Sequence, residues 1–212
     1  MKLAMFGVTG TVGSVLLERA LREGHQVQAL VRSASSLKTR DQNLSVTHGD
    51  VGNAAAVDAV LNGVDGVLST LGGSRGPESL SIGTATITSA MAGHGVRRIV
   101  VAQGFHLRFP GDPANFGQRV MGLMMSRLIP GINENGAAMV EALLRCDLDW
   151  TVVRMCRVVT DNTRHPGRRD YRTGTLRLAP WSTVQVGDAA DFMLECVGSD
   201  RNLRQAPMIA SR

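Results

Sequence analysis

The clearest indication of the fold is the segment at residues 1–21, which reads MKLAMFGVTGTVGSVLLERAL. A short apolar run leads into glycines at Gly7, Gly10 and Gly13, and a helix-like pattern follows at once. A glycine-rich turn between a strand and a helix is typical of proteins that bind dinucleotide phosphates. The alternative interpretation is a tight turn that binds no ligand.

Each glycine has a separate physical task in such a turn. Gly7 permits a sharp turn at the end of the strand, and Gly10 lets a pyrophosphate approach because it has no Cβ. Gly13 lets the helix pack closely on the strand. The N–H groups of the first helical turn then face the phosphates.

The end of the expected second strand indicates which dinucleotide binds. Arg32 and Ser33 stand where a site that prefers NAD usually has an acidic residue. A guanidinium pairs with a phosphate through two parallel hydrogen bonds, whereas an acid would repel it. The sequence therefore predicts NADP(H), and an ordinary surface arginine is the alternative.

Two further strand ends complete a nucleotide crevice. Asp50 and Val51 follow the third expected strand, where Asp50 is placed to meet the adenine amino group. Leu71, Gly72 and Gly73 follow the fourth, at the switch point where such sheets bind ligands. The two glycines permit close approach of the nicotinamide ribose. Each of these residues also fits a purely structural turn.

Strand and helix signals alternate through the first half of the chain. The expected strands cover residues 3–6, 26–31, 44–47, 66–70 and 98–102. The expected helices cover 11–22, 35–40, 53–61 with Asn53 as N-cap, and 81–92. This order predicts an α/β fold of the Rossmann type, a doubly wound parallel sheet with helices on both faces.

The second half is less regular and contains no clear linker or repeat. The pattern predicts a loop over 105–115, helices over 118–128, 133–145 and 187–196, strands over 150–154 and 207–210, and a hairpin over 170–178. We expect a single NAD(P)-binding domain over residues 1–212, with an irregular C-terminal substrate-side region. The expected substrate-side insertions cover about 104–132 and 155–182.

Composition narrows the possible partners. The chain has 212 residues, 43% of them hydrophobic, and a net charge of +5, which suits one domain with an anionic ligand. No apolar run is long enough to cross a membrane, and no signal peptide is apparent. No basic surface interleaved with aromatic residues is apparent, so nucleic acid is not an expected partner. We expect a cytoplasmic protein with a small-molecule partner and no membrane partner.

The three cysteines predict no metal site. Cys146, Cys156 and Cys196 are far apart and lack the spacing of metal ligands. We expect them to be reduced thiols that are mostly buried.

Seven segments carry a resemblance to a known family: FGVTGTVG, ALVR, HGDV, VLSTLGG, HGVRRIVVAQG, DLDWTVVR and VQVGDAADFMLECV. The chain resembles the atypical short-chain dehydrogenase/reductase superfamily, and within it the group of biliverdin-IXβ reductase/flavin reductase and NmrA-like proteins. The resemblance covers nearly the whole chain and implies a Rossmann fold that binds NADP(H). It places these residues near the cofactor: Gly7, Thr9, Gly10, Thr11, Val12, Arg32, Asp50, Leu71 and Gly72.

The chain departs from this family where catalysis is expected. Similar reductases carry Ser or Thr near the nicotinamide, where this chain has Gly104 or its neighbour and no hydroxyl. The superfamily's Tyr-x-x-x-Lys acid is absent, because the one tyrosine, Tyr171, has no lysine at that spacing. Relatives often have Arg-Pro after the sixth strand, whereas this chain has Arg154-Met155, whose peptide carbonyls are expected to face the nicotinamide.

Two other side chains are the remaining catalytic candidates. His106 follows the fifth expected strand and has the ordinary pKa of a general acid near neutral pH. Gln103 is placed to donate a hydrogen bond to a developing oxyanion. The alternative for His106 is a loop histidine with no chemical role.

Hydride transfer needs little from the protein besides placement, because the cofactor carries the reactive bond. The leading hypothesis is therefore an NADPH-dependent reductase of a conjugated or aromatic molecule: a flavin, quinone, tetrapyrrole or polyketide-like compound. The alternatives are an NADP(H)-binding redox sensor of the NmrA-like type and an isomerase or epimerase that retains its cofactor. The Met-rich segment 118–128 is either core, an interface of a homodimer, or a lid over an apolar substrate.

Overall fold

The computed structural model describes residues 1–33, 37, 39–72, 78–113, 115–160 and 170–212. Within these residues, eight strands form a central sheet in the order β3-β2-β1-β4-β5-β6-β10-β8. They are β1 (Lys2–Phe6), β2 (Gln26–Val31), β3 (Leu44–His48), β4 (Gly66–Ser69), β5 (Arg98–Gly104), β6 (Asp149–Met155), β8 (Tyr171–Gly174) and β10 (Met208–Ser211). Neighbouring strands in the described part run parallel, apart from β8, which is antiparallel to β10. The predicted Rossmann-type sheet is therefore confirmed.

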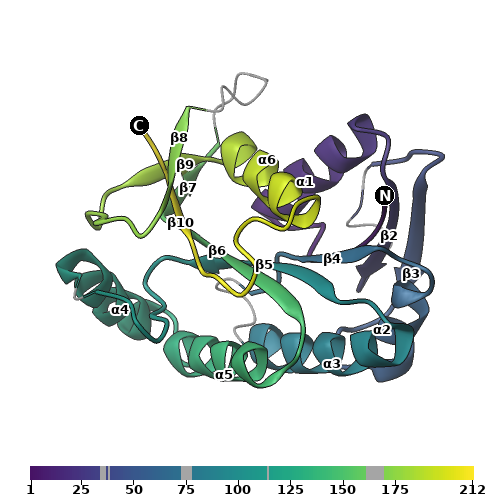
Figure 1. Cartoon of the computed structure of the whole chain (residues 1–212), viewed down its shortest axis with the longest axis horizontal. Helices are drawn as coiled ribbons and strands as arrows, with labels where there is room; N and C mark the ends of the chain where they lie inside the picture. Colours follow the sequence, from purple (N-terminus) through teal and green to yellow (C-terminus); the bar gives the residue numbers. More distant parts are fainter. Residues whose placement is uncertain (34–36, 38, 73–77, 114, 161–169) are drawn as a thin grey trace.

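Helices cover both faces of this sheet (Figure 1). On one face, α1 (Thr11–Arg22) packs against α6 (Val186–Val197). On the other face lie α2 (Ala54–Leu61), α3 (Glu78–His94) and α5 (Ile132–Arg145). At one end of the molecule, α4 (Phe116–Leu128) extends beyond α5, and a two-stranded sheet pairs β7 (Arg157–Val159) with β9 (Thr183–Gln185).

The strands of the sheet are apolar because helices bury both faces of the sheet. Along β1, Leu3 and Met5 join the core under α1 and α6, while Ala4 and Phe6 join the core over α2, α3 and α5. Successive side chains of a strand point to opposite faces, so a strand covered by helices on both sides is apolar throughout.

The strand order locates the crevice. The chain runs outward from β1 through β2 to β3, and then returns to place β4 on the other side of β1. The carboxyl ends of β1 and β4 therefore flank the switch point, where sheets of this kind bind ligands.

The predicted bounds of helix 11–22 and strand 26–31 hold, and most of the other bounds differ by a few residues. The N-cap of α2 is confirmed, because Asn53 Oδ1 accepts hydrogen bonds from the N–H groups of Ala55 at 3.0 Å and Ala56 at 3.3 Å. Helix α3 is longer than predicted and ends at His94, because Gly95 adopts a φ of +66° that stops the helix.

The hairpin predicted over 170–178 is wrong. Residues 171–174 form β8, but their partner is β10, with Tyr171 opposite Ser211 and Gly174 opposite Met208. The turn residues predicted a partner a few residues away, but β8 instead pairs with the edge of β10, which is distant in the sequence. Of the helix predicted over 35–40, Leu37, Thr39 and Arg40 are not helical, and the other residues lie outside the described ones.

Candidate functional site

The glycine turn lies at the carboxyl end of β1 and is closely packed. Gly7 has a φ of +84°, and its carbonyl accepts a hydrogen bond from the Gly10 N–H at 3.0 Å. A Cβ at Gly13 would stand 2.1 Å from the Gly7 oxygen, while a Cβ at Gly10 would stand 3.4 Å from it. Gly7 and Gly13 are therefore required by packing, whereas the space above Gly10 is open.

Thr70 holds this turn against the end of β4. Its N–H donates to the Phe6 carbonyl at 2.9 Å, and its hydroxyl lies 3.1 Å from the carbonyls of both Phe6 and Gly7. No role for Thr70 was predicted from the sequence. The signal available was a hydroxyl residue at the end of the strand beside the glycine turn.

The N–H groups in the first turn of α1 have no partner within the helix. Gly10 is the N-cap and supplies no side-chain cap, and the first turn contains no acidic residue. The N–H groups of Thr11, Val12 and Gly13 have no carbonyl partner within the helix. Thr9, Gly10 and Thr11 are exposed and Val12 is half-buried. This is an anion site of the kind that binds pyrophosphate, and the open space over Gly10 fits that group.

Arg32 and Ser33 follow the end of β2 directly, beside β1 in the sheet. Both side chains are exposed. This position is one strand away from the glycine turn, where the 2′ position of an adenosine ribose is expected.

The ends of β3 and β4 converge on α3. A Cβ at Gly83 of α3 would lie 2.6 Å from Leu71 Cδ1 and 3.0 Å from Val51 Cγ2, so Val51 and Leu71 line the same region. Asp50 is exposed, and its Oδ1 accepts the Gly52 N–H at 2.9 Å.

Gly72 is exposed and has a φ of +113°. Gly73 lies outside the described residues.

The end of β5 carries two buried polar groups without partners among the described residues. They are Gln103 Nε2 and His106 Nε2. The Gln103 amide is oriented by its own oxygen, which accepts the Gly104 N–H at 2.7 Å. His106 is 9% exposed, and this burial lowers the pKa of its imidazole below the ordinary value, so the ring is neutral at neutral pH.

The imidazole of His106 fills the space beside Gly104. A Cβ at Gly104 would stand 2.5 Å from both Cε1 and Nδ1 of His106. A serine or threonine at residue 104 therefore does not fit unless the ring moves. The histidine side chain occupies the place that the resemblance assigned to a hydroxyl residue.

Arg154 and Met155, which were predicted to lie near the cofactor, form hydrogen bonds with other residues of the protein. The Arg154 guanidinium is buried in an ion pair with Asp112, with Nη2 2.9 Å from Oδ1, and its Nε donates to the Ala206 carbonyl at 2.7 Å. The Met155 carbonyl, which the resemblance turned toward the nicotinamide, accepts the Phe105 N–H at 2.8 Å. These two residues anchor the segment that contains His106.

The electrostatics of Asp112 fit this anchoring role. Burial by itself would raise the pKa of this carboxyl, but the hydrogen bonds from Arg154 and from the Phe109 N–H outweigh it and lower the pKa. The carboxylate is therefore ionised, and it neutralises the buried guanidinium.

Comparisons with known proteins agree with this geometry. Residues 7–200 match a protein family described as NAD(P)H-binding. A stretch of 103 residues is 32% identical to YwnB of Bacillus subtilis, an uncharacterised protein, and covers 48% of this chain and 46% of that one. The matched stretch thus spans about half the length of this curated relative.

Two solved structures share the fold along nearly the whole chain. ChuY of Escherichia coli O157:H7, described as an anaerobilin reductase, has a TM-score of 0.78 at 18% identity, over 100% of this chain and 97% of that one. A short-chain dehydrogenase/reductase of Veillonella parvula, solved with NADP, has a TM-score of 0.75 at 15% identity, over 98% and 93%. At these identities the likeness concerns the fold alone.

Proposed function

The chain belongs to the NAD(P)H-binding family, and from that premise we propose that it is an NADPH-dependent reductase of a conjugated or aromatic small molecule. The observation that carries the proposal is the pair of buried, unpartnered donors on Gln103 and His106, on the same sheet edge as the glycine turn. A buried polar group without a partner is costly, so a ligand that accepts hydrogen bonds is the expected partner. Suitable acceptors are a flavin, a quinone, a tetrapyrrole or a polyketide-like compound.

The cofactor proposal is NADP(H) rather than NAD(H). An exposed arginine, Arg32, follows β2 where an acid would select NAD(H). We expect Arg32→Glu to weaken NADPH binding far more than NADH binding in fluorescence titrations. The matched control is Arg22→Glu, at an exposed position on the last turn of α1. Equal losses for both cofactors would contradict the assignment to a 2′-phosphate.

The protein's part in the chemistry is to position and to stabilise charge. Bound NADPH would supply a hydride to the acceptor. With its proton on Nε2, the neutral His106 ring donates a hydrogen bond, and the Gln103 amide donates a second one. Together they stabilise negative charge that develops on the acceptor, which then takes a proton from solvent. The proposal thus needs no Tyr–Lys pair.

Conjugated acceptors suit this arrangement best, because they spread the developing charge and are protonated readily by water. The solved relative ChuY is described as an anaerobilin reductase, which supports including linear tetrapyrroles among the substrates tested. We further propose a cytoplasmic location, which suits an enzyme whose three cysteines form no disulfide in the structure.

The first experiment follows the loss of NADPH absorbance with a panel of flavins, quinones and linear tetrapyrroles. Turnover with one class, reduced at least about tenfold by His106→Ala or Gln103→Ala, would support the proposal. The matched control is His48→Ala, at an exposed position of β3. Turnover that neither site variant changes would refute the roles of both residues.

The missing Tyr–Lys pair also favours a second candidate, a redox sensor that binds NADP(H) without turnover. Tight NADPH binding with no oxidation by any acceptor would favour the sensor. A cofactor-retaining isomerase or epimerase would instead return a labelled hydride to the cofactor without net oxidation.

A further inference from the structure

Helix α4 exposes several large apolar side chains to solvent. Phe116 is 80% exposed, Leu128 70%, Leu123 56% and Met124 47%. These four residues lie within an arc of about 140° around the helix axis, because each residue advances an α-helix by about 100°. A stripe of this kind normally packs into the core.

The side of α4 that packs against the protein is apolar too, because Met121 packs against the core and Met125 is half-buried. Gly117 and Gln118 are its buried residues, and Gln118 Nε2 donates to the Phe105 carbonyl at 2.9 Å. Gly122 and Ser126, one and two turns further on, are half-buried on the same side. The helix therefore has apolar side chains on its packed side and on its exposed side, and the exposed ones are available to a partner.

A second segment extends this face. Trp181 is 78% exposed, and it belongs to the segment 175–181 that packs against the start of α4. Asn115 Nδ2 donates to the Leu176 carbonyl at 3.2 Å, and a Cβ at Gly117 would meet the Leu178 oxygen at 2.0 Å. We call α4 together with residues 171–181 the outer face.

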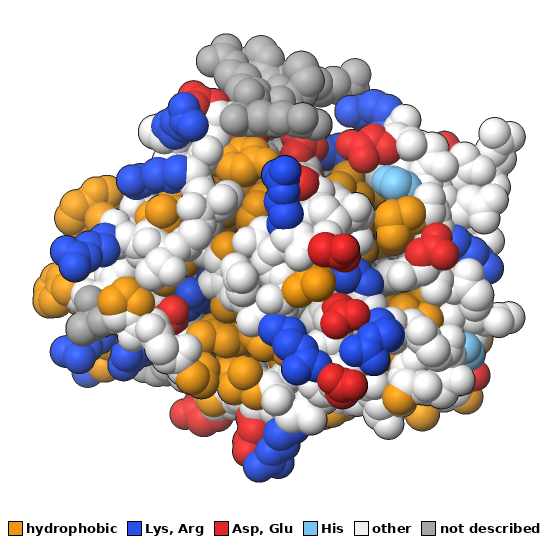
Figure 2. All heavy atoms as spheres, in the orientation of Figure 1, with side chains coloured by type: hydrophobic (Ala, Val, Ile, Leu, Met, Phe, Trp, Pro, Cys, Tyr) orange, Lys and Arg blue, Asp and Glu red, His pale blue; other side chains and the backbone are white. Residues whose placement is uncertain are grey.

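The outer face carries arginines and no acid. Residues 116–128 and 171–181 contain Arg119, Arg127, Arg172 and Arg177, all exposed, and neither Asp nor Glu. Within the described residues these four form no ion pair, although arginines elsewhere on the surface pair with acids. Figure 2 shows Lys and Arg side chains among hydrophobic ones along the left edge, where α4 and the 171–181 segment lie.

These charges argue against a second copy as the partner. A two-fold interface brings the same patch from both subunits together, and four arginines on each side would repel. An apolar face with Trp, Phe and Leu among arginines instead matches helices that lie in the surface of an anionic bilayer. We propose that the outer face binds peripherally to anionic phospholipid membranes.

This binding is to the membrane surface, not across it. Helix α4 has 13 residues, and among the described residues no helix is long and apolar enough to cross a bilayer. The expectation of no membrane partner rested on the absence of such a span. The orientation of α4 was not visible in its sequence, since the same spacing serves a core helix.

The test is co-sedimentation of the full chain with vesicles of phosphatidylcholine alone and of phosphatidylcholine mixed with phosphatidylglycerol. We expect binding to the anionic vesicles only. Each arginine near an anionic surface contributes about fivefold to binding, so Arg119→Gln with Arg127→Gln should weaken it about 30-fold. Phe116→Ser with Leu128→Ser should also abolish binding, because the apolar contact is lost.

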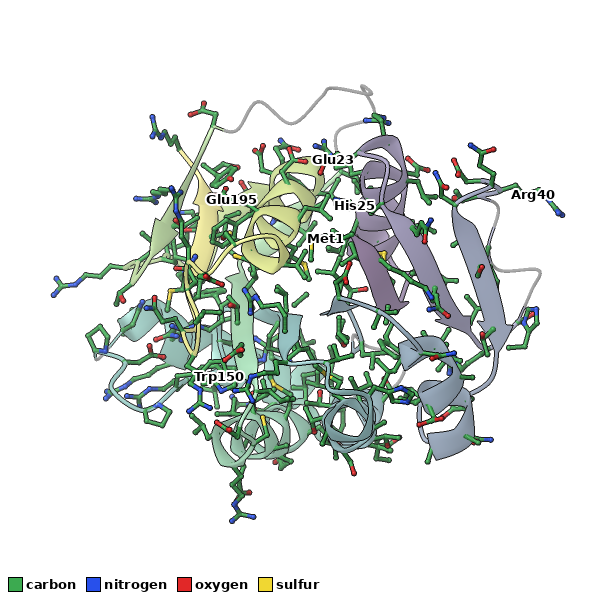
Figure 3. The ribbon with its side chains drawn as sticks, turned by 45° about the vertical axis from the view of Figure 1, so that its right-hand side comes forward. Met1, Glu23, His25, Arg40, Trp150 and Glu195 are labelled. Atoms are coloured by element: carbon green, nitrogen blue, oxygen red, sulfur yellow. The ribbon has the colours of Figure 1, made fainter. Side chains whose placement is uncertain are left out.

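The chain offers matched controls and a built-in reporter. Leu144→Ser on α5, where Leu144 is 48% exposed, and Arg40→Gln, at the opposite edge of the sheet (Figure 3), should bind as the wild type does. The chain has two tryptophans, and Trp150 is 5% exposed inside the fold, so Trp181 dominates the change in emission. We expect a blue shift with anionic vesicles that is lost in Trp181→Phe.

Three results would overturn the proposal. The first is no enrichment of the protein on anionic vesicles, and the second is an equal loss of vesicle binding in the control and outer-face variants. The third is a wild type that does not bind vesicles and forms a dimer in light scattering, which Phe116→Ser dissociates. If the serine variant does not fold, the arginine variant and the emission of the wild type still decide the question. Neither readout depends on NADPH turnover, so a failure of this proposal can be distinguished from a failure of the reductase proposal.

Discussion

Alanine at Gly13 and at Gly10 should separate the packing task of the glycine turn from its binding task. A Cβ at Gly13 would stand 2.1 Å from the Gly7 oxygen and 2.6 Å from Thr70 Oγ1, far inside van der Waals contact. The Gly7 carbonyl and the Thr70 hydroxyl both take part in hydrogen bonds that fix the glycine turn, so neither can move away easily. The added methyl group therefore forces α1 to move. Overpacking of this kind costs about 3 kcal/mol, which lowers Tm by about 6–12 °C in a chain of this length.

Gly10→Ala should leave stability nearly unchanged and weaken NADPH binding. Its Cβ would lie 3.4 Å from the Gly7 oxygen, and the backbone at φ −80°, ψ 170° is open to alanine. We expect a Tm change of at most about 4 °C, since an N-cap alanine costs only about 1 kcal/mol. The added methyl points to where the pyrophosphate would approach, so NADPH affinity should fall at least about tenfold, or 1.4 kcal/mol.

Scanning calorimetry without ligand and fluorescence titration with NADPH measure the two effects separately. A Gly13→Ala protein as stable as the wild type would refute the packing argument. A Gly10→Ala protein that binds NADPH with unchanged affinity would show that the pyrophosphate does not approach the backbone at this turn.

Three further predictions concern stability. Asp112→Asn leaves the buried Arg154 guanidinium without its counter-charge, and urea denaturation should show a loss of about 3–5 kcal/mol; a loss below about 1 kcal/mol would mean that the pair is solvated. Because burial lowers the pKa of His106, the folded state binds fewer protons than the unfolded state, so stability should fall as pH drops below 6.5 until the folded-state pKa is reached. His106→Gln should remove that fall and His48→Gln should not. Gly93→Ala, in α3 with no atom within 4 Å of the new Cβ, should raise stability by about 0.5–1 kcal/mol and Tm by about 1–4 °C, and an unchanged Tm would count against a helical residue 93.

The first half of the fold follows from local sequence signals. The helix 11–22 and the strand 26–31 have the same bounds in the structure as in the prediction. Apolar spacing, glycine turns and caps such as Asn53 act within a few residues, so they can be read without knowledge of the fold. The second half is less regular, and there Tyr171–Gly174 pairs with a strand more than thirty residues later, which no local signal announces.

The candidate site divides in the same way. The glycine turn and the arginine after β2 are visible in the sequence, because each needs a given residue type at a given distance from a strand end. The tie through Thr70, the burial of His106 against Gly104 and the ion pair that occupies Arg154 depend on segments brought together from far apart.

The Rossmann-type sheet and its switch point can be predicted from the sequence alone, because hydrophobic periodicity and glycine spacing are local properties. Whether an apolar helix face points to the core or to solvent depends instead on how distant segments pack. The exposed apolar side chains from Phe116 to Leu128 face solvent because other side chains of the same helix, Met121 and Gln118, make its contacts with the core and with residues 105–107. Periodicity specifies that a helix has an apolar face, and the packing of the rest of the chain determines whether that face is covered.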